Sequence, residues 1–137
     1  MEVYKCLCCS KEFEAFPSQK KKFCDTKCQN DYQYKEFIQQ WKNGEHNGMR
    51  GKTATSHHIR RYLFEKCNNS CVECGWSKTN LFTNKIPLEL DHVDGDFTNN
   101  KEDNLKLLCP NCHSLTATWK GANKKQGRPR TKYYRGL

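Results

Sequence analysis

The hydrophobic and polar positions of the first half of the chain predict two helices. Apolar or aromatic side chains at positions 34, 37, 38 and 41 follow the spacing of one helix face, and Gly44 ends that pattern. A helix is therefore expected over residues 26–43. Residues 57–67 predict a second helix, with Ser56 as its N-cap. The segment 43–56 is rich in Gly, Asn, Ser and Thr, which predicts a linker.

The second half predicts strands and a short helix. Residues 86–93 alternate apolar and polar side chains after a proline, which indicates a strand. "LKLLC", residues 105–109, predicts another strand beyond a polar loop. "NCHSLTATWKG", residues 111–121, predicts a short helix that Gly121 ends. The order strand, loop, strand, helix indicates a small α+β fold.

Composition limits the size and the setting of this fold. The 137 residues are 35% hydrophobic and 28% charged, which allows one or two small domains with a modest core. The net charge of +9 indicates a polyanionic partner, most simply nucleic acid. No secretory signal is visible, and no run reaches the roughly 18 apolar residues of a membrane span. We therefore expect an intracellular protein with no membrane partner, whose ten cysteines bind metal rather than form disulfides.

The cysteines fall into two groups of four. Each group offers two close pairs of thiols, which suits a tetrahedral structural Zn²⁺ ion; the groups are Cys6, Cys9, Cys24 and Cys28, and Cys71, Cys74, Cys109 and Cys112. Cys8 could replace Cys6 or Cys9 in the first group. Cys8 and Cys67 are otherwise left for packing or as free thiols.

"CPNCH", residues 109–113, admits a second interpretation, because Cys-x-x-Cys-His can also attach haem. Covalent haem attachment normally belongs to exported proteins and needs another axial ligand. The matching pair Cys71 and Cys74 upstream favours zinc. Two structural Zn²⁺ ions are therefore expected, and they would stabilise a zinc-dependent fold.

The segment "LELDHVDGDFTNNKEDNLKLLCPNCHS", residues 88–114, resembles the HNH endonucleases. The resemblance covers about residues 71–121 and is strongest with the four-cysteine type of small phage and bacterial nucleases, which includes free-standing homing endonucleases. It rests on Asp91-His92, the loop after them, Asn104-Leu105 and the Cys-x-x-Cys-His run, in that order. It implies a ββα-metal fold, in which a strand pair and a helix surround one divalent ion.

The same resemblance implies roles for four residues in the hydrolysis of DNA phosphodiester bonds. His92 would be the general base, and Asp91 and His113 would hold the catalytic metal. Asn104 would stabilise the loop and the geometry of the base. Mg²⁺ or Mn²⁺ suits two protein ligands with open positions, and Ni²⁺, Co²⁺ or Zn²⁺ stays possible. The products would carry 5′-phosphate and 3′-hydroxyl ends.

Basic residues extend this expectation to double-stranded DNA as the partner. From Asn104 onward the chain has eight Lys or Arg residues and no acid. The expected DNA contacts are Arg60, Arg61, Lys120, Lys124, Lys125, Arg128 and Arg130. Arg-Pro-Arg at 128–130 resembles the core of an AT-hook, and the alternative is a disordered basic tail that contacts phosphates alone.

The expected organisation has four parts. These are an N-terminal four-cysteine zinc finger (1–34), a helix and linker (35–56), an HNH nuclease domain with its structural zinc (57–121) and a basic tail (122–137). The finger would either read DNA or dock a protein partner. The main alternative function is a non-catalytic, zinc-dependent DNA-binding regulator, and a zinc-finger adaptor for proteins is a third. A monomer or a homodimer would act in the cytoplasm of a bacterium or a phage-infected host.

Overall fold

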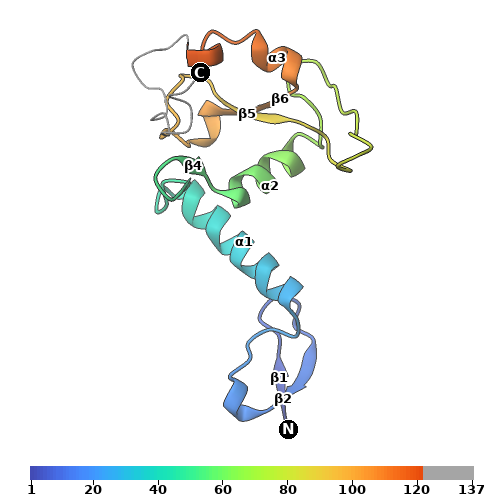
Figure 1. The fold of residues 1–137 in the computed structure, drawn as a ribbon. Coiled ribbons are helices and arrows are strands. Elements are labelled where there is room, and N and C mark those ends of the chain that lie inside the picture. Colours follow the sequence, from blue (N-terminus) through green and yellow to red (C-terminus); the bar gives the residue numbers. More distant parts are fainter. Residues whose placement is uncertain (122–137) are drawn as a thin grey trace, which may run out of the picture.

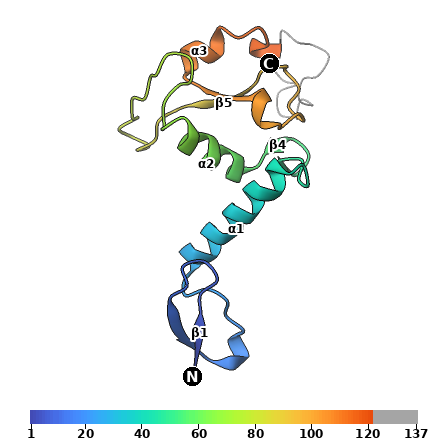
Figure 2. The same ribbon diagram turned by 180° about the vertical axis from the view of Figure 1, so that it is seen from behind.

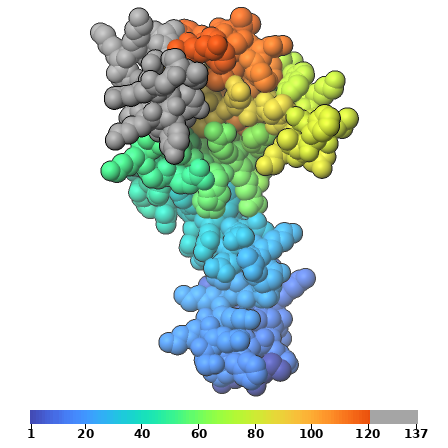
Figure 3. All heavy atoms as spheres, viewed as in Figure 1, coloured from blue at the N-terminus to red at the C-terminus, as the bar shows by residue number. Residues whose placement is uncertain are grey.

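A computed structural model describes residues 1–121 of the chain. It has a small mixed α/β fold in which one long helix joins an N-terminal unit to a larger C-terminal body (Figure 1). The same arrangement is seen from behind in Figure 2. The space-filling view shows that the molecule narrows between the two parts (Figure 3). Within residues 1–121, no helix combines the length and the apolar character needed to cross a membrane.

The N-terminal unit consists of a hairpin, a turn region and the start of the long helix. Strands β1 (Glu2–Lys5) and β2 (Glu12–Ala15) pair antiparallel. The long helix α1 (Thr26–Lys42) begins at Asp25, whose carboxylate accepts a hydrogen bond from the backbone N–H of Cys28 at 2.6 Å. The helix predicted over residues 26–43 is confirmed.

The segment predicted as a linker contains structure of its own. Strands β3 (Met49–Arg50) and β4 (Ala54–Thr55) form a short hairpin after α1. Gly48 has a φ of +76°, which a residue with a side chain rarely adopts. Helix α2 (His57–Lys66) follows at once, and its predicted N-cap is confirmed, because the Ser56 hydroxyl accepts from the N–H of His58 at 3.2 Å.

The C-terminal body adds a strand pair and a short helix to α2. Strands β5 (Glu89–His92) and β6 (Leu105–Leu108) pair antiparallel, close to the two predicted strands. Helix α3 spans only Pro110–Ser114, so the helix predicted to run to residue 121 is wrong beyond Ser114. The hydroxyls of Ser114 and Thr116 donate to the backbone carbonyls of Asn111 and His113, at 2.7 and 2.9 Å. Such bonds compete with the helix ladder and favour its end.

One continuous core joins these elements. It contains Trp41 from the end of α1 and Ile59 and Leu63 from α2; the other buried members are Cys71, Leu88, Leu105, Leu107, Leu108 and Cys109. Leu107 and Ile59 are fully buried, so α2 and the strand pair pack directly on each other. The C-terminal turn of α1 is thus part of the larger body, whereas its N-terminal turn belongs to the N-terminal unit.

Candidate active site and metal centres

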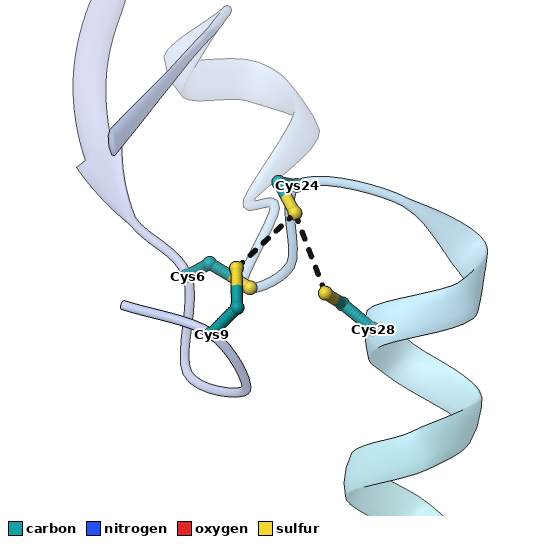
Figure 4. Close-up of side chains that lie close together, drawn as sticks. All are labelled: Cys6, Cys9, Cys24 and Cys28. Carbon is teal, nitrogen blue, oxygen red and sulfur yellow. Dashed lines mark hydrogen bonds between the residues drawn. The ribbon is translucent and has the colours of Figure 1, made fainter. Parts of the chain in front are cut away.

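The first cluster of cysteines lies where the N-terminal hairpin meets α1. The sulfurs of Cys6, Cys9, Cys24 and Cys28 all lie within 4.8 Å of one another and point to a common centre (Figure 4). The sulfurs of Cys9 and Cys24 are 3.7 Å apart. A tetrahedral zinc site with Zn–S bonds of about 2.3 Å requires S···S distances of about 3.8 Å. The four donors therefore fit a zinc ion, and Cys8 is not among them.

The second cluster joins a turn after α2 to the start of α3. The sulfurs of Cys71, Cys74, Cys109 and Cys112 also lie within 4.8 Å of one another. The first pair sits in a tight turn, in which Gly75, at a φ of +77°, donates its N–H to the carbonyl of Cys71 at 2.8 Å. The second pair frames the first turn of α3, because the sulfur of Cys109 caps that helix. This cluster can therefore fix the direction in which α3 leaves β6.

The charge of the thiols favours a cation in each cluster. Burial opposes the ionisation of Cys6 and Cys71, but backbone N–H groups aimed at each sulfur outweigh burial and lower the pKa of both thiols to about 6. Hydrogen bonds with the sulfurs of Cys109 and Cys74 raise the pKa of Cys112 to about 12. One thiol of each cluster thus ionises readily. The remaining thiolates need a divalent cation to offset their mutual repulsion.

The sequence-predicted metal ligands Asp91 and His113 come together on one face of the strand pair. His113 Nε2 lies 3.7 Å from Asp91 Oδ1. The other ring nitrogen, Nδ1, makes a hydrogen bond with the carboxylate of Glu89, which shares a face with Asp91 because alternate strand residues point the same way. A carboxylate on Nδ1 fixes the proton there and leaves Nε2 as the free donor atom. The pair therefore offers a carboxylate oxygen and an imidazole nitrogen to one cation.

His92 points to the opposite face of β5, toward the core. Its side chain is 8% exposed, and its Nε2 lies 2.9 Å from the amide oxygen of Asn100. Among the described residues, no buried side-chain nitrogen or oxygen lacks a hydrogen-bond partner. The hydrogen bond to Asn100 uses Nε2, and the second ring nitrogen, Nδ1, has no hydrogen bond among the described residues. Because a buried nitrogen would need a partner, Nδ1 must reach solvent. The expected base is thus held at one nitrogen and open at the other.

Asn104 closes the loop between the two strands. Its amide oxygen accepts from the backbone N–H of Asp94 at 3.0 Å. Its amide nitrogen donates to the carboxylate of Asp94 and to the carbonyl of Asn99, at 2.9 and 2.8 Å. The amide of Asn99, followed by the N–H of Asp96 and the amide of Asn104, lowers the pKa of Asp94. Asp94 is therefore engaged within the loop, and Asn104 holds the loop that carries Asn100.

The expected DNA-binding residues occupy different surroundings. Arg60 is exposed on α2. The guanidinium of Arg61 lies 3.0 Å from a carboxylate oxygen of Asp31 and 3.0 Å from one of Glu65. It also stacks over the ring of Tyr34, so Arg61 links α1 and α2. Lys120 follows Trp119, whose ring meets the His113 ring edge to face at 5.1 Å. Lys124, Lys125, Arg128 and Arg130, with the rest of the tail, lie outside the described residues.

A groove runs beside Asp91. It has a volume of 410 Å³ and is lined by β5, β6 and α3, with Asp91, Lys106 and Thr116 among its walls. Lys106 is the partner of Asp91 across the strand pair, and its ammonium lies 2.8 Å from Glu73. The groove therefore holds the ion pair of Lys106 and Glu73 beside Asp91.

Sequence reasoning missed the contacts that Glu89, Asn100 and Lys106 make at the site. Glu89 could have been found, because it lies two residues before Asp91 on the same strand face. The position of Lys106 opposite Asp91 depends on the strand register, which cannot be deduced from the sequence. Asn100 required the path of the loop, since its side chain could equally have faced solvent.

The comparisons with known proteins give one informative match. A segment of 55 residues, 40% of this chain, is 51% identical to the H-N-H endonuclease F-TflIV of Escherichia phage T5. The match spans 23% of that protein. No protein-family model matches the chain, and no solved structure matches it. The resemblance to the HNH endonucleases is thereby confirmed over the matched segment, and the cysteine clusters fit the zinc-containing type.

Proposed function

We propose that the protein is a metal-dependent DNA endonuclease of the HNH type, with β5, β6 and α3 as its ββα-metal unit. The observation that carries this proposal is the convergence of Asp91 and His113 at 3.7 Å, with His92 as the next residue on the strand. The phage relative carries the name of such an endonuclease, which supports the same assignment.

The metal ions in this proposal have separate roles. Zn²⁺ in each four-cysteine cluster would stabilise the fold. Asp91 and His113 would hold a further divalent cation, Mg²⁺ or Mn²⁺ in the first place and Ni²⁺, Co²⁺ or Zn²⁺ as alternatives. When bound, that cation would supply positive charge to the scissile phosphate and to the leaving oxygen. The second zinc cluster and Glu89 then fix where His113 points.

The protein groups divide the hydrolysis between the two faces of β5. His92 Nδ1 takes a proton from a water molecule, whose oxygen attacks phosphorus while the bond from phosphorus to the 3′ oxygen breaks, and the departing 3′ oxygen takes a proton from solvent. The products carry a 5′-phosphate and a 3′-hydroxyl. Asp91 and His113 act from the opposite face of β5. The scissile phosphate therefore lies at the end of β5, with His92 on one side and Asp91 and His113 on the other. Asn104 keeps the loop closed and thereby keeps His92 in place.

The remaining surfaces have proposed roles in DNA binding. Lys106 lies opposite Asp91 and suits the scissile phosphate, and Lys120 would contact a neighbouring phosphate. The tail, residues 122–137, would add phosphate contacts. The unit 1–34 would choose the DNA site or dock a protein, while residues 57–121 cut. One such site per chain makes nicking the outcome for a monomer, acting in a bacterial or phage-infected cell.

The test is a plasmid-nicking assay with Mg²⁺ or Mn²⁺ on the zinc-loaded, full-length protein. The wild type should nick the plasmid, and both His92→Ala and Asp91→Asn should lose at least about 10²-fold in rate. His57→Ala is the matched histidine control, since this exposed side chain lies at the start of α2, and its rate should equal that of the wild type. Thermal melts would show that each variant is folded.

Three outcomes would count against the proposal. Equal cleavage by the wild type and His92→Ala would refute His92 as the base. No cleavage by the wild type across several metals and DNA substrates, with DNA binding retained, would favour the regulator. Deleting residues 122–137 should weaken binding and flatten its salt dependence, so unaltered affinity at low salt would exclude the tail from the DNA contact.

A further inference from the structure

Asn100, which contacts His92, takes part in several hydrogen bonds. It is 3% exposed, and its amide oxygen lies 2.9 Å from His92 Nε2. The hydroxyl of Thr55 donates to the same oxygen at 3.0 Å. The indole N–H of Trp41 donates to the backbone carbonyl of Asn100 at 2.7 Å. Both donors come from outside the segment that resembles HNH endonucleases.

The orientation of the Asn100 amide follows from its other neighbours. Its nitrogen lies 3.4 Å from the carbonyl oxygen of Asn47 and 3.0 Å from the sulfur of Met49, both of which can only accept. The amide oxygen therefore faces Thr55 and His92. An amide oxygen cannot donate, so the proton of this hydrogen bond must lie on His92 Nε2. In the neutral ring the lone pair is then on Nδ1.

We infer that Asn100 is the positioning residue of the base, and that Trp41 and Thr55 lock it in place. Asn100 holds His92 as the Nε2–H tautomer and leaves Nδ1, the nitrogen that reaches solvent, as the proton acceptor. The role of Nδ1 rests on the proposed function, whereas the hydrogen bond does not. The end of α1 and the β3–β4 hairpin thereby belong functionally to the catalytic region.

The main chain at Gly48 packs closely against Asn100 and its neighbours. A Cβ atom on Gly48 would lie 2.6 Å from Ile59 Cδ1, 2.8 Å from Asn100 Cβ and 3.3 Å from Trp41 Nε1. The carbonyl of Gly48 also accepts from the N–H of Ser56 at 2.8 Å. The main chain at Gly48, just before the hairpin, therefore lies directly against Asn100, and only a glycine fits at this position.

The test compares Asn100→Leu with Asn100→Asp in the zinc-loaded, full-length protein. Leucine has a similar shape but no acceptor, whereas aspartate keeps the acceptor and loses the N–H that faces Asn47. Proton–nitrogen NMR of the histidine rings, with His92→Ala to assign the signal, should show a slowly exchanging Nε2 proton on His92 in the wild type. That signal should persist in Asn100→Asp and vanish in Asn100→Leu. Both variants disturb the surroundings of residue 100, so a general loss of order would affect the signal in both.

Kinetics supply the second measurement. Asn100→Leu should lower kcat on the order of 10²-fold while the Kd for DNA, measured without added Mg²⁺, stays within about twofold. Trp41→Phe, which removes the indole N–H together with part of a buried ring, should lower kcat by about tenfold. A proton on Nδ1 in the wild type, or wild-type kcat in Asn100→Leu, would overturn the inference. A locked His92 in a protein that cuts no DNA would instead refute the endonuclease and leave the hydrogen bond standing.

Discussion

The two four-cysteine clusters have similar sulfur geometry but very different surroundings. Within residues 1–25, only Cys6 and Ala15 are buried apolar side chains, at 2% and 3% exposure. The second cluster borders a core that contains Ile59, Leu107 and Leu108, each at most 2% exposed. We therefore expect the first unit to depend on a bound metal for most of its folding free energy. In the second region, we expect both the metal and the apolar core to contribute.

The largest expected effect is the loss of the first cluster. Cys24→Ser removes one of four ligands from a unit without a core, and zinc binding is worth about 10–16 kcal/mol in such units. NMR spectra should show residues 1–25 unfolded while signals of the core remain. Cys8→Ser is the matched control, because Cys8 lies outside the cluster, and its spectrum should match the wild type. An ordered N-terminal unit in Cys24→Ser would break the comparison.

The second prediction concerns the core of the larger body. Trp41→Ala removes a 6% exposed side chain that packs on Tyr62 edge to face. The free energy of unfolding of the C-terminal body should fall by about 3–5 kcal/mol. The zinc affinity of the first cluster should not change, since Trp41 lies at the other end of α1. Denaturant melts and zinc competition would measure the two quantities, and a parallel loss in both would show that the two regions fold as one.

A smaller effect is expected at the start of α2. Ser56→Ala removes the hydroxyl that accepts from the N–H of His58, which should cost about 1 kcal/mol in the C-terminal body. Ser56→Thr keeps the cap and serves as the control in the same melts. Equal stability of the alanine variant and the wild type would mean that the cap contributes nothing.

The smallest effect is expected at the junction between the helices. Arg61→Met removes the contacts to Asp31 and Glu65, but these groups are partly exposed, so the loss should not exceed about 1 kcal/mol. Raising the salt concentration should shrink the difference between variant and wild type. A loss that exceeds this and does not respond to salt would show that the junction is fixed by packing on Tyr34 instead.

Residues whose role depends on spacing were predictable. The helical spacing from position 34 to 41 and the cap at Ser56 were sufficient to place α1 and α2. The cysteine pairs were sufficient to group eight sulfurs. In each case, neighbours in the sequence determine the local structure.

Residues whose role depends on the folded path were not predictable. Asn100 receives bonds from Trp41 and Thr55, which lie 59 and 45 positions away, so no local pattern announces them. Arg61 was assigned to DNA from its charge, and its contact with Asp31 required the crossing of α1 and α2. The predicted helix after Cys112 was too long. The hydroxyls of Ser114 and Thr116 favour its end, but in the sequence they look like ordinary polar residues on the surface of a helix.

The 17 residues of α1 have a further mechanical consequence. At 1.5 Å per residue they span about 25 Å, and both ends of the rod are anchored, one by a cysteine of the first cluster and the other by Trp41 in the core. Any partner of the N-terminal unit would therefore be held at a fixed distance from the core around Trp41. Along B-form DNA, at about 3.4 Å per base pair, the length of α1 corresponds to about seven base pairs.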